Sequence, residues 1–170
     1  MDQKEKVISI LKYAQEMELA GRDFYEDKGK VFSSPTTRNM FQELADAEQQ
    51  HYELITSQLA SYTEDPASYA VSDAILARDE SNIFQQREGS ESLDTTLVES
   101  DVPDLTVMRM AYLIERDYKE FYEEAIDMVE EENVKLLLKR LSDWELGHER
   151  LFKKEYDRLK KEYLTFPWGG

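Results

Sequence analysis

Hydrophobic residues recur at helical spacing along two long stretches of the chain, with polar residues at the positions between them. Val7, Leu11 and Ala14 are separated by three or four residues, which is typical of one face of an amphipathic α-helix. Continued through both stretches, this spacing predicts four helices, over residues 3–30, 35–62, 103–129 and 133–163. Short turns separate the helices within each stretch, so the pattern indicates two antiparallel helical hairpins.

The second and fourth helices also have local sequence signals at their starts. Ser33 and Ser34 before Pro35 predict a turn with a serine N-cap and a proline at the first helical position. Three consecutive glutamates, residues 130–132, precede the fourth helix, and their charge suits the positive end of a helix dipole.

A long connection, residues 63–102, joins the two hairpins and has only weak periodicity, with room for a short amphipathic helix within 67–88. Such a connection is unusual in a compact domain unless it has to travel the length of the bundle. We therefore predict an all-α fold, a ferritin-like four-helix bundle of two hairpins joined by a long crossover. Residues 1–163 form this single domain, and residues 164–170 form an apolar C-terminal tail.

The amino-acid composition of the chain argues against several classes of function. The chain has 170 residues and a formal net charge of −16, which argues against binding nucleic acid or anionic membranes through Lys and Arg. It has no cysteine, which excludes disulfides, thiolate nucleophiles, Cys-bound zinc and iron–sulfur clusters. No stretch approaches the ~20 apolar residues of a membrane span and no signal peptide is recognisable, so we expect a cytoplasmic location.

The chain contains only two histidines, and each ends the same pattern of residues. A glutamate lies 33 residues before each histidine, a tyrosine 26 before it and a second glutamate 3 before it. The first set is Glu18, Tyr25, Glu48 and His51, and the second, shifted by 97 residues, is Glu115, Tyr122, Glu145 and His148. A repeat of residue types that bind metals indicates a duplicated site.

The predicted hairpins bring these repeated residues together. Glu18 and Glu48 are centred on the first turn, and Glu115 and Glu145 on the second, so each pair lies level within its hairpin. Residues three apart project to one side of a helix, so each Glu-x-x-His motif offers two side chains to one face. Four bare carboxylates in a core would be very costly, whereas two divalent cations bring their summed charge to zero.

These residue types predict a dinuclear metal centre. One imidazole per metal with oxygen-rich ligation suits iron or manganese better than zinc. Two iron ions, two manganese ions or a mixed pair would all fit this pattern. By position, Glu18 and His51 are terminal ligands of one metal, Glu115 and His148 are terminal ligands of the other, and Glu48 and Glu145 are bridges.

Tyr25 and Tyr122 follow the first glutamate of each set by seven residues and lie close to the same helix face. Their hydroxyls are candidates to hydrogen-bond the ligands, and to orient a carboxylate or donate a proton. Asp46 and Asp143 also repeat, but they lie on the opposite side of their helices and are expected at the surface.

The sequence around these positions resembles the rubrerythrin family of the ferritin-like diiron superfamily. The resemblance covers about residues 1–62 and 101–163. It rests on Glu18-Leu-Ala-Gly-Arg-Asp-Phe-Tyr25, Glu48-Gln-Gln-His51, Glu115-Arg-Asp-Tyr-Lys-Glu-Phe-Tyr122 and Glu145-Leu-Gly-His148. It implies reduction of hydrogen peroxide, or of dioxygen, at a diferrous centre, with oxidation of iron as the source of electrons.

Two features depart from the pattern of that family. Tyr118 stands where the family has an extra glutamate, and a phenol cannot serve as an exchanging carboxylate. The Cys-ligated rubredoxin module that supplies electrons in the family is missing, so we expect an external donor, a rubredoxin-like protein or a flavoprotein.

The leading hypothesis is therefore a diiron protein that reduces peroxide, with a homodimer as the expected assembly. The alternatives are a ferroxidase that handles iron, an oxygenase acting on an unknown organic substrate, and a non-catalytic interaction module. The apolar tail, residues 164–170, is expected to pack on the bundle or on a second copy, with docking to another protein as the alternative.

Overall fold

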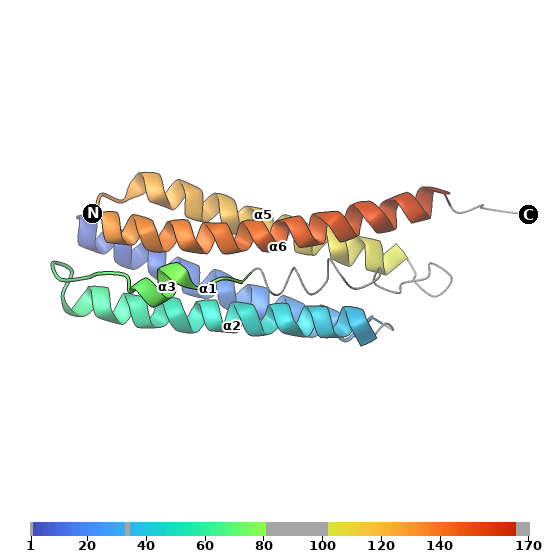
Figure 1. The fold of residues 1–170 in the computed structure, drawn as a ribbon, viewed down its shortest axis with the longest axis horizontal. Coiled ribbons are helices and arrows are strands. Elements are labelled where there is room, and N and C mark those ends of the chain that lie inside the picture. The colour runs from blue at the N-terminus through green and yellow to red at the C-terminus, as the bar shows by residue number, and fades with distance from the viewer. Residues whose placement is uncertain (1, 33–34, 81–101, 166–170) are drawn as a thin grey trace, which may run out of the picture.

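The computed structural model describes residues 2–32, 35–80 and 102–165. Four long helices lie side by side in a bundle, and a short fifth helix lies on its outside (Figure 1). They are α1 (Gln3–Gly29), α2 (Pro35–Glu64), α3 (Asp73–Ala77), α5 (Val102–Met128) and α6 (Glu132–Thr165). The predicted all-α, ferritin-like bundle is confirmed.

The long helices begin and end within one or two residues of the predicted bounds. Asp2 caps α1 by accepting a hydrogen bond from the Glu5 backbone at 2.7 Å, and the Glu5 side chain accepts one from the Asp2 backbone at 3.1 Å. Pro35 is the first residue of α2, as predicted. The expected serine cap at Ser33 and Ser34 lies outside the described residues, as do residues 81–101 of the crossover and 166–170 of the tail.

The two hairpins point toward opposite ends of the bundle. In Figure 1, α1 and α6 run from left to right, and α2 and α5 run from right to left. α1 packs mainly against α2, and α5 mainly against α6. The repeated ligand-type residues lie near the middle of their helices, so hairpins that enter from opposite ends still bring both sets to one level.

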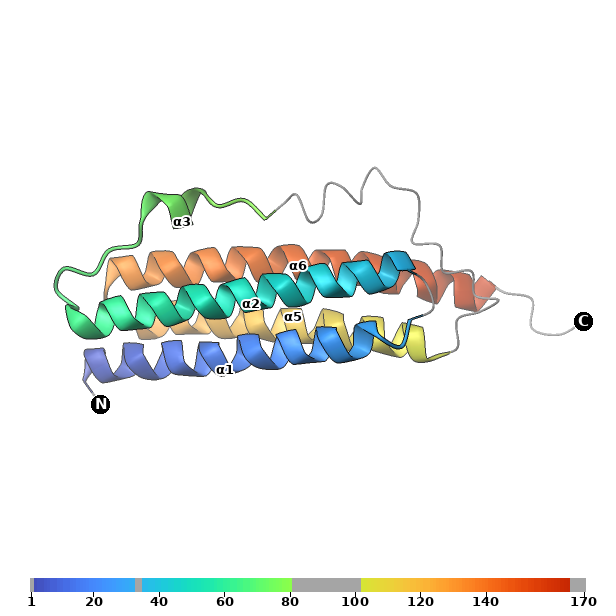
Figure 2. The same cartoon turned by 90° about the horizontal axis from the view of Figure 1, so that it is seen from below.

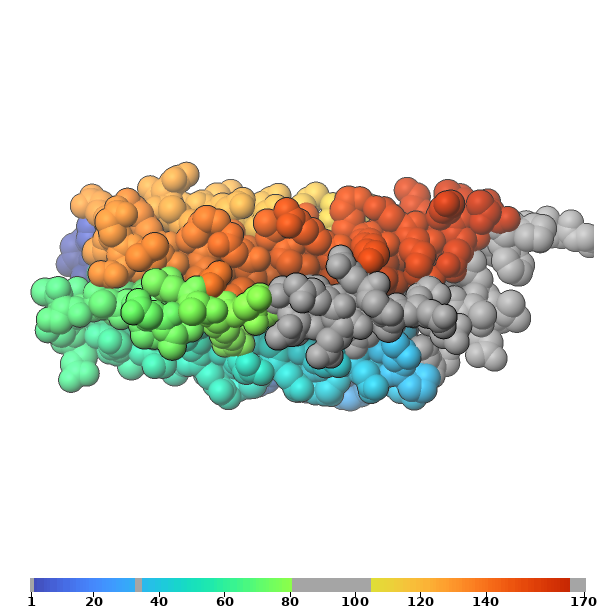
Figure 3. Space-filling view, in the orientation of Figure 1, coloured from blue at the N-terminus to red at the C-terminus, as the bar shows by residue number. Residues whose placement is uncertain are grey.

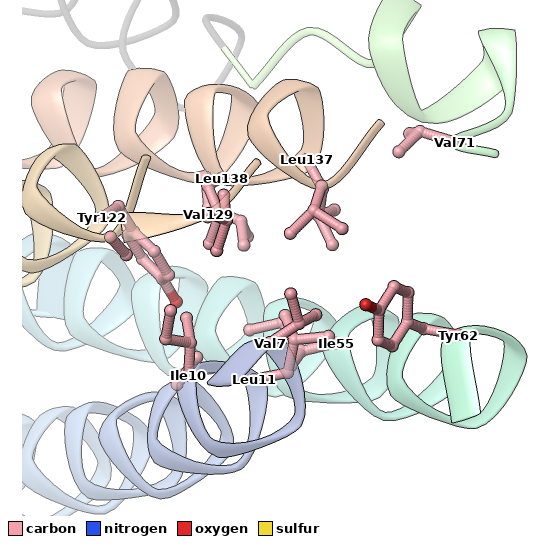
Figure 4. Close-up of a cluster of buried hydrophobic side chains, with 14 of the residues drawn as sticks. Val7, Ile10, Leu11, Ile55, Tyr62, Val71, Tyr122, Val129, Leu137 and Leu138 are labelled. Atoms are coloured by element: carbon pink, nitrogen blue, oxygen red, sulfur yellow. The ribbon is translucent and has the colours of Figure 1, made fainter. Parts of the chain in front are cut away.

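The apolar core consists of two clusters, one toward each end of the bundle. The first contains Val7, Leu11, Ile55, Tyr122 and Leu138, and Figure 4 shows how side chains of this cluster from different helices meet. The second contains Tyr25, Phe41, Leu44, Met108 and Phe152. Along each long helix, the predicted ligands lie between residues of one cluster and residues of the other, so apolar side chains close both ends of the site.

The described part of the crossover, up to residue 80, runs along the face of the bundle formed by α2 and α6 (Figures 1 and 2). Figure 3 shows the segment that contains α3 filling the surface between these two helices. Tyr69 and Val71 bury their side chains in the first cluster, and a guanidinium N–H of Arg140 on α6 donates to the Leu76 carbonyl. The short helix expected within residues 67–88 is α3.

None of the helices in the described parts of the chain combines the length and the apolar character needed to cross a membrane.

Two glycines of α1 have different surroundings and give a test of the packing. A Cβ at Gly29 would lie 2.8 Å from Phe41 Cβ, an atom fixed by its own backbone. A Cβ at Gly21 would lie 3.1 Å from the end of the Tyr118 ring, which can shift. We expect Gly29→Ala to lower the free energy of unfolding by about 1–3 kcal/mol and Gly21→Ala to change it by less than about 1 kcal/mol. Urea unfolding of the metal-free proteins measures both, and a Gly29→Ala variant more stable than the parent would contradict the packing.

Candidate metal centre

The structure brings all six predicted ligand residues to one place inside the bundle. Each of the four long helices contributes, and every one of the six residues is 0% exposed. They are Glu18 on α1, Glu48 and His51 on α2, Glu115 on α5, and Glu145 and His148 on α6. Small residues three or four positions before the glutamates are also buried and leave room beside them: Ala14, Ala45, Ala111 and Ser142.

The six residues form two overlapping groups, each able to hold one metal ion. Glu18 and His51 form one group with Glu48 and Glu145, and Glu115 and His148 form the other with the same two glutamates. Within each group, one ligand atom from every residue lies within 4.8 Å of the others. Glu48 and Glu145 are thus shared, which is the geometry expected for bridging carboxylates between two terminal Glu–His pairs.

Both histidines point the same ring nitrogen at the carboxylates. His51 Nδ1 lies 3.2 Å from a Glu145 oxygen and 3.3 Å from a Glu18 oxygen. His148 Nδ1 lies 3.2 Å from Glu115 and 3.4 Å from Glu145. The two rings are nearly parallel, at 12°, with centroids 5.7 Å apart. Nδ1 is therefore the atom that each imidazole can offer to a metal.

The two tyrosines connect the hairpins across the site. Tyr25 on α1 donates its hydroxyl to the Glu115 carboxylate on α5, and Tyr122 on α5 donates to Glu18 on α1. Burial raises the pKa of both phenols well above the ordinary value, so each hydroxyl keeps its proton near neutral pH. Each terminal glutamate is thus oriented by a tyrosine of the other half.

The polar atoms of the site fit divalent cations. Among the described residues, no carboxylate oxygen of Glu48 or Glu145 accepts a hydrogen bond in suitable geometry, although all four oxygens are buried. Buried acceptors without donors are rare and costly in native proteins, and a cation satisfies them directly. Four carboxylates and two neutral imidazoles balance the charge of two divalent ions.

The excess of negative charge at the site also changes the pKa values of its residues. Burial and the neighbouring Glu48 charge raise the pKa of Glu18 to about 8. Burial is the largest single effect on His51 and would lower its pKa, but the charges of Glu18 and Glu80 and the contact with Glu145 together outweigh it and raise that pKa well above the ordinary value. Metal ions bound at this site would take the place of these protons.

The remaining residues singled out in the sequence lie outside the two groups. Asp46 and Asp143 are exposed, as expected. Tyr118 is partly buried, and its hydroxyl donates to the Met17 backbone carbonyl at 2.6 Å, so it is committed to the backbone of α1. Its ring packs against Gly21.

Sequence reasoning missed one buried carboxylate at the site, that of Glu80. This residue of the crossover is 6% exposed, and both of its oxygens lie 3.1 Å from His51 Nε2. Burial opposes its charge, but the two histidines hold its pKa well below the ordinary range. Glu80 has no counterpart 97 residues away and follows no helical period, so neither the repeat nor the spacing could indicate it.

Comparison with known proteins places the chain in a family. The model of the rubrerythrin family matches residues 9–156, which include most of both hairpins and all six predicted ligands. The chain belongs to the rubrerythrin family. A comparison with curated protein sequences gives no significant match.

Solved structures share the fold at low sequence identity. A hypothetical protein from Pyrococcus furiosus is 23% identical, with 91% of this chain and 90% of that chain covered and a TM-score of 0.64. A structure of KatB, a manganese catalase from Anabaena, is 18% identical, with 100% and 78% covered and a TM-score of 0.65. A second KatB structure, from Anabaena PCC7120, is 19% identical, with 99% and 77% covered and a TM-score of 0.63. At these identities the likeness establishes the fold of this rubrerythrin-family chain and nothing finer.

Metal binding should stabilise the protein, because it relieves the repulsion among the buried carboxylates. With Mn²⁺ at about 100 times its dissociation constant, we expect about 2.7 kcal/mol of stabilisation from each of the two sites and a rise in Tm of about 10–20 °C. Glu48→Gln removes an oxygen shared by both groups and should abolish most of the rise. Glu53→Gln, an exposed change on the same helix, should leave it intact. Differential scanning calorimetry with and without Mn²⁺ measures the shift, and an equal rise in Glu48→Gln would contradict the assignment.

Proposed function

We propose that this rubrerythrin-family chain holds two iron ions and reduces hydrogen peroxide, or dioxygen, while Fe(II) is oxidised. The observation that carries the proposal is the pair of buried ligand groups that share Glu48 and Glu145. Their oxygen-rich ligands with one imidazole each suit iron or manganese. Membership of the rubrerythrin family supports iron as the metal, and the similarity to the fold of a manganese catalase makes manganese the alternative.

The metals would supply the electrons, since two ferrous ions that become ferric release the two electrons that convert one peroxide molecule and two protons into two water molecules. The chain supplies ligands that fix the separation of the ions. Carboxylates on four different helices define the two positions, and the helices are held by apolar clusters on both sides. Such support limits the reorganisation of the ligands between oxidation states.

The reaction consumes protons, so a proton donor must lie inside this buried site. Tyr25 and Tyr122 are fully buried, stay protonated near neutral pH and already hydrogen-bond the terminal glutamates. We assign them as the groups that hold a proton at the phenolic oxygen beside the site and orient Glu115 and Glu18. A positioned general acid of this kind typically contributes about 10²–10⁴ to a rate.

The return of electrons to the site needs a partner. The chain has no cysteine, so it cannot ligate the iron of a rubredoxin-type centre through its own thiolates. We propose that a rubredoxin-like protein or a flavoprotein donates electrons in trans, and that the chain forms a homodimer.

The proposal predicts fast, site-dependent oxidation of bound Fe(II) by peroxide. Anaerobic protein loaded with two equivalents of Fe(II) is mixed with hydrogen peroxide in a stopped-flow instrument, and the near-ultraviolet absorption of ferric iron is followed. Tyr25→Phe and Tyr122→Phe should bind the same amount of iron and react at least about tenfold more slowly. Tyr118→Phe, which loses a hydrogen bond to the backbone only, should react at the parental rate.

The controls distinguish peroxide reduction from the alternative functions. Glu48→Gln with the same Fe(II) measures the reaction of unbound iron. Oxidation by dioxygen that outpaces oxidation by peroxide, with ferric iron leaving the site, would favour a ferroxidase instead. Equal rates for parent and Glu48→Gln would contradict any catalytic role of the site.

A further inference from the structure

The crossover returns to the bundle at Glu80, where it meets the outer edges of both histidines. His51 Nε2 lies 3.1 Å from each Glu80 oxygen, and His148 Nε2 lies 3.6 Å from Glu80 Oε2. The first contact is a hydrogen bond, and the second is within ion-pair distance. One carboxylate of the crossover thus faces the two imidazoles that come from different hairpins.

Glu80 lies on the side of the rings opposite the ligand groups. Nδ1 of each histidine faces the carboxylates of the bundle, and Nε2 faces Glu80. An acceptor at Nε2 stabilises the tautomer with a proton on Nε2, which leaves the lone pair of Nδ1 free for a metal. The position of Glu80 therefore matches the ring atom that each imidazole presents to the centre.

Neighbouring side chains hold the Glu80 carboxylate in this place. Arg78 pairs with Glu80 at 2.7 Å and donates to the Gln50 side chain on α2 at 2.8 Å. The Arg78 guanidinium also lies 4.9 Å from the centre of the Trp144 ring on α6, and Trp144 stacks on His51 at 5.0 Å and 14°. The end of the described crossover is thus fixed to both helices that carry the histidines.

We propose that Glu80 is a positioning residue for the dinuclear centre, in which its carboxylate holds both metal-binding imidazoles through Nε2 and so connects the two metal sites from outside the bundle. The inference rests on the proposed metal centre. It gives the crossover a chemical role besides joining the hairpins.

The two oxygens of Glu80 make the test specific. Glu80→Ala removes the hydrogen-bond acceptor of His51 Nε2 and the carboxylate oxygen that lies 3.6 Å from His148 Nε2. Glu80→Gln keeps the size of the side chain but has one acceptor oxygen and an NH₂ group that cannot accept from an imidazole N–H. We expect the glutamine to retain the closer contact, with His51, and to lose the longer one, with His148.

The experiment uses the full chain with Zn²⁺ as a diamagnetic probe and ¹⁵N-labelled histidine. Because the chain has two histidines, two Nε2–H resonances report on them separately. In the parent we expect both resonances far downfield and protected from exchange with water.

In Glu80→Ala both resonances should shift upfield and exchange faster, and the Zn²⁺ affinity measured by chelator competition should fall about ten- to hundredfold. In Glu80→Gln mainly the His148 resonance should change. Asp73→Asn, an exposed change on the same crossover, should match the parent.

The possible results test the positioning role of Glu80 separately from the existence of the metal centre. If the parent does not bind Zn²⁺ at the two histidines, the metal centre is wrong, and the role of Glu80 with it. If the parent binds Zn²⁺ and Glu80→Ala leaves the Nε2–H resonances unchanged, the metal centre stands and the positioning role is overturned. A fall in affinity without a change in either resonance would also overturn it, because Glu80 would then contribute only to folding.

Discussion

The burial of four glutamates and two histidines at the centre of an apolar bundle is the constraint on which the rest of the structure depends. Carboxylates at this depth repel one another and lack water, so the bundle is at its most favourable when cations occupy the space between them. The apolar clusters on both sides keep water out and fix the helices, and the two tyrosines tie each terminal glutamate to the opposite hairpin. Stability of the fold and chemistry of the site are therefore coupled.

The topology lets one short sequence pattern be used twice. Each hairpin provides two carboxylates, an imidazole and a phenol, but neither hairpin alone completes either ligand group, because each group needs the central glutamate of the other half. The long crossover reverses the direction in which the second hairpin enters the bundle (Figure 1). Its described end also places Glu80 against the histidines of both hairpins, so the segment that joins the halves lies against the centre that they build.

The parts of the structure that follow a period or a repeat could be predicted from the sequence. Helical spacing located the four long helices, and the repeat at 97 residues singled out the residues that converge, including Glu18 and His148. The spacing of Tyr25 and Tyr122 predicted that both lie close to the ligands. It did not predict that each tyrosine binds the glutamate of the other hairpin, because a helical period gives directions within one hairpin only. Glu80 was missed because it lies in an irregular segment, where position is set by tertiary contacts such as those of Arg78 and Trp144.

Anomalous diffraction from crystals of the protein loaded with Fe(II) under anaerobic conditions tests the central claim most directly. The account predicts two iron peaks per chain inside the bundle, both adjacent to Glu48 and Glu145, with one beside His51 and the other beside His148. Iron found only on the acidic surface, or a site that remains without iron when Fe(II) is in excess, would contradict it.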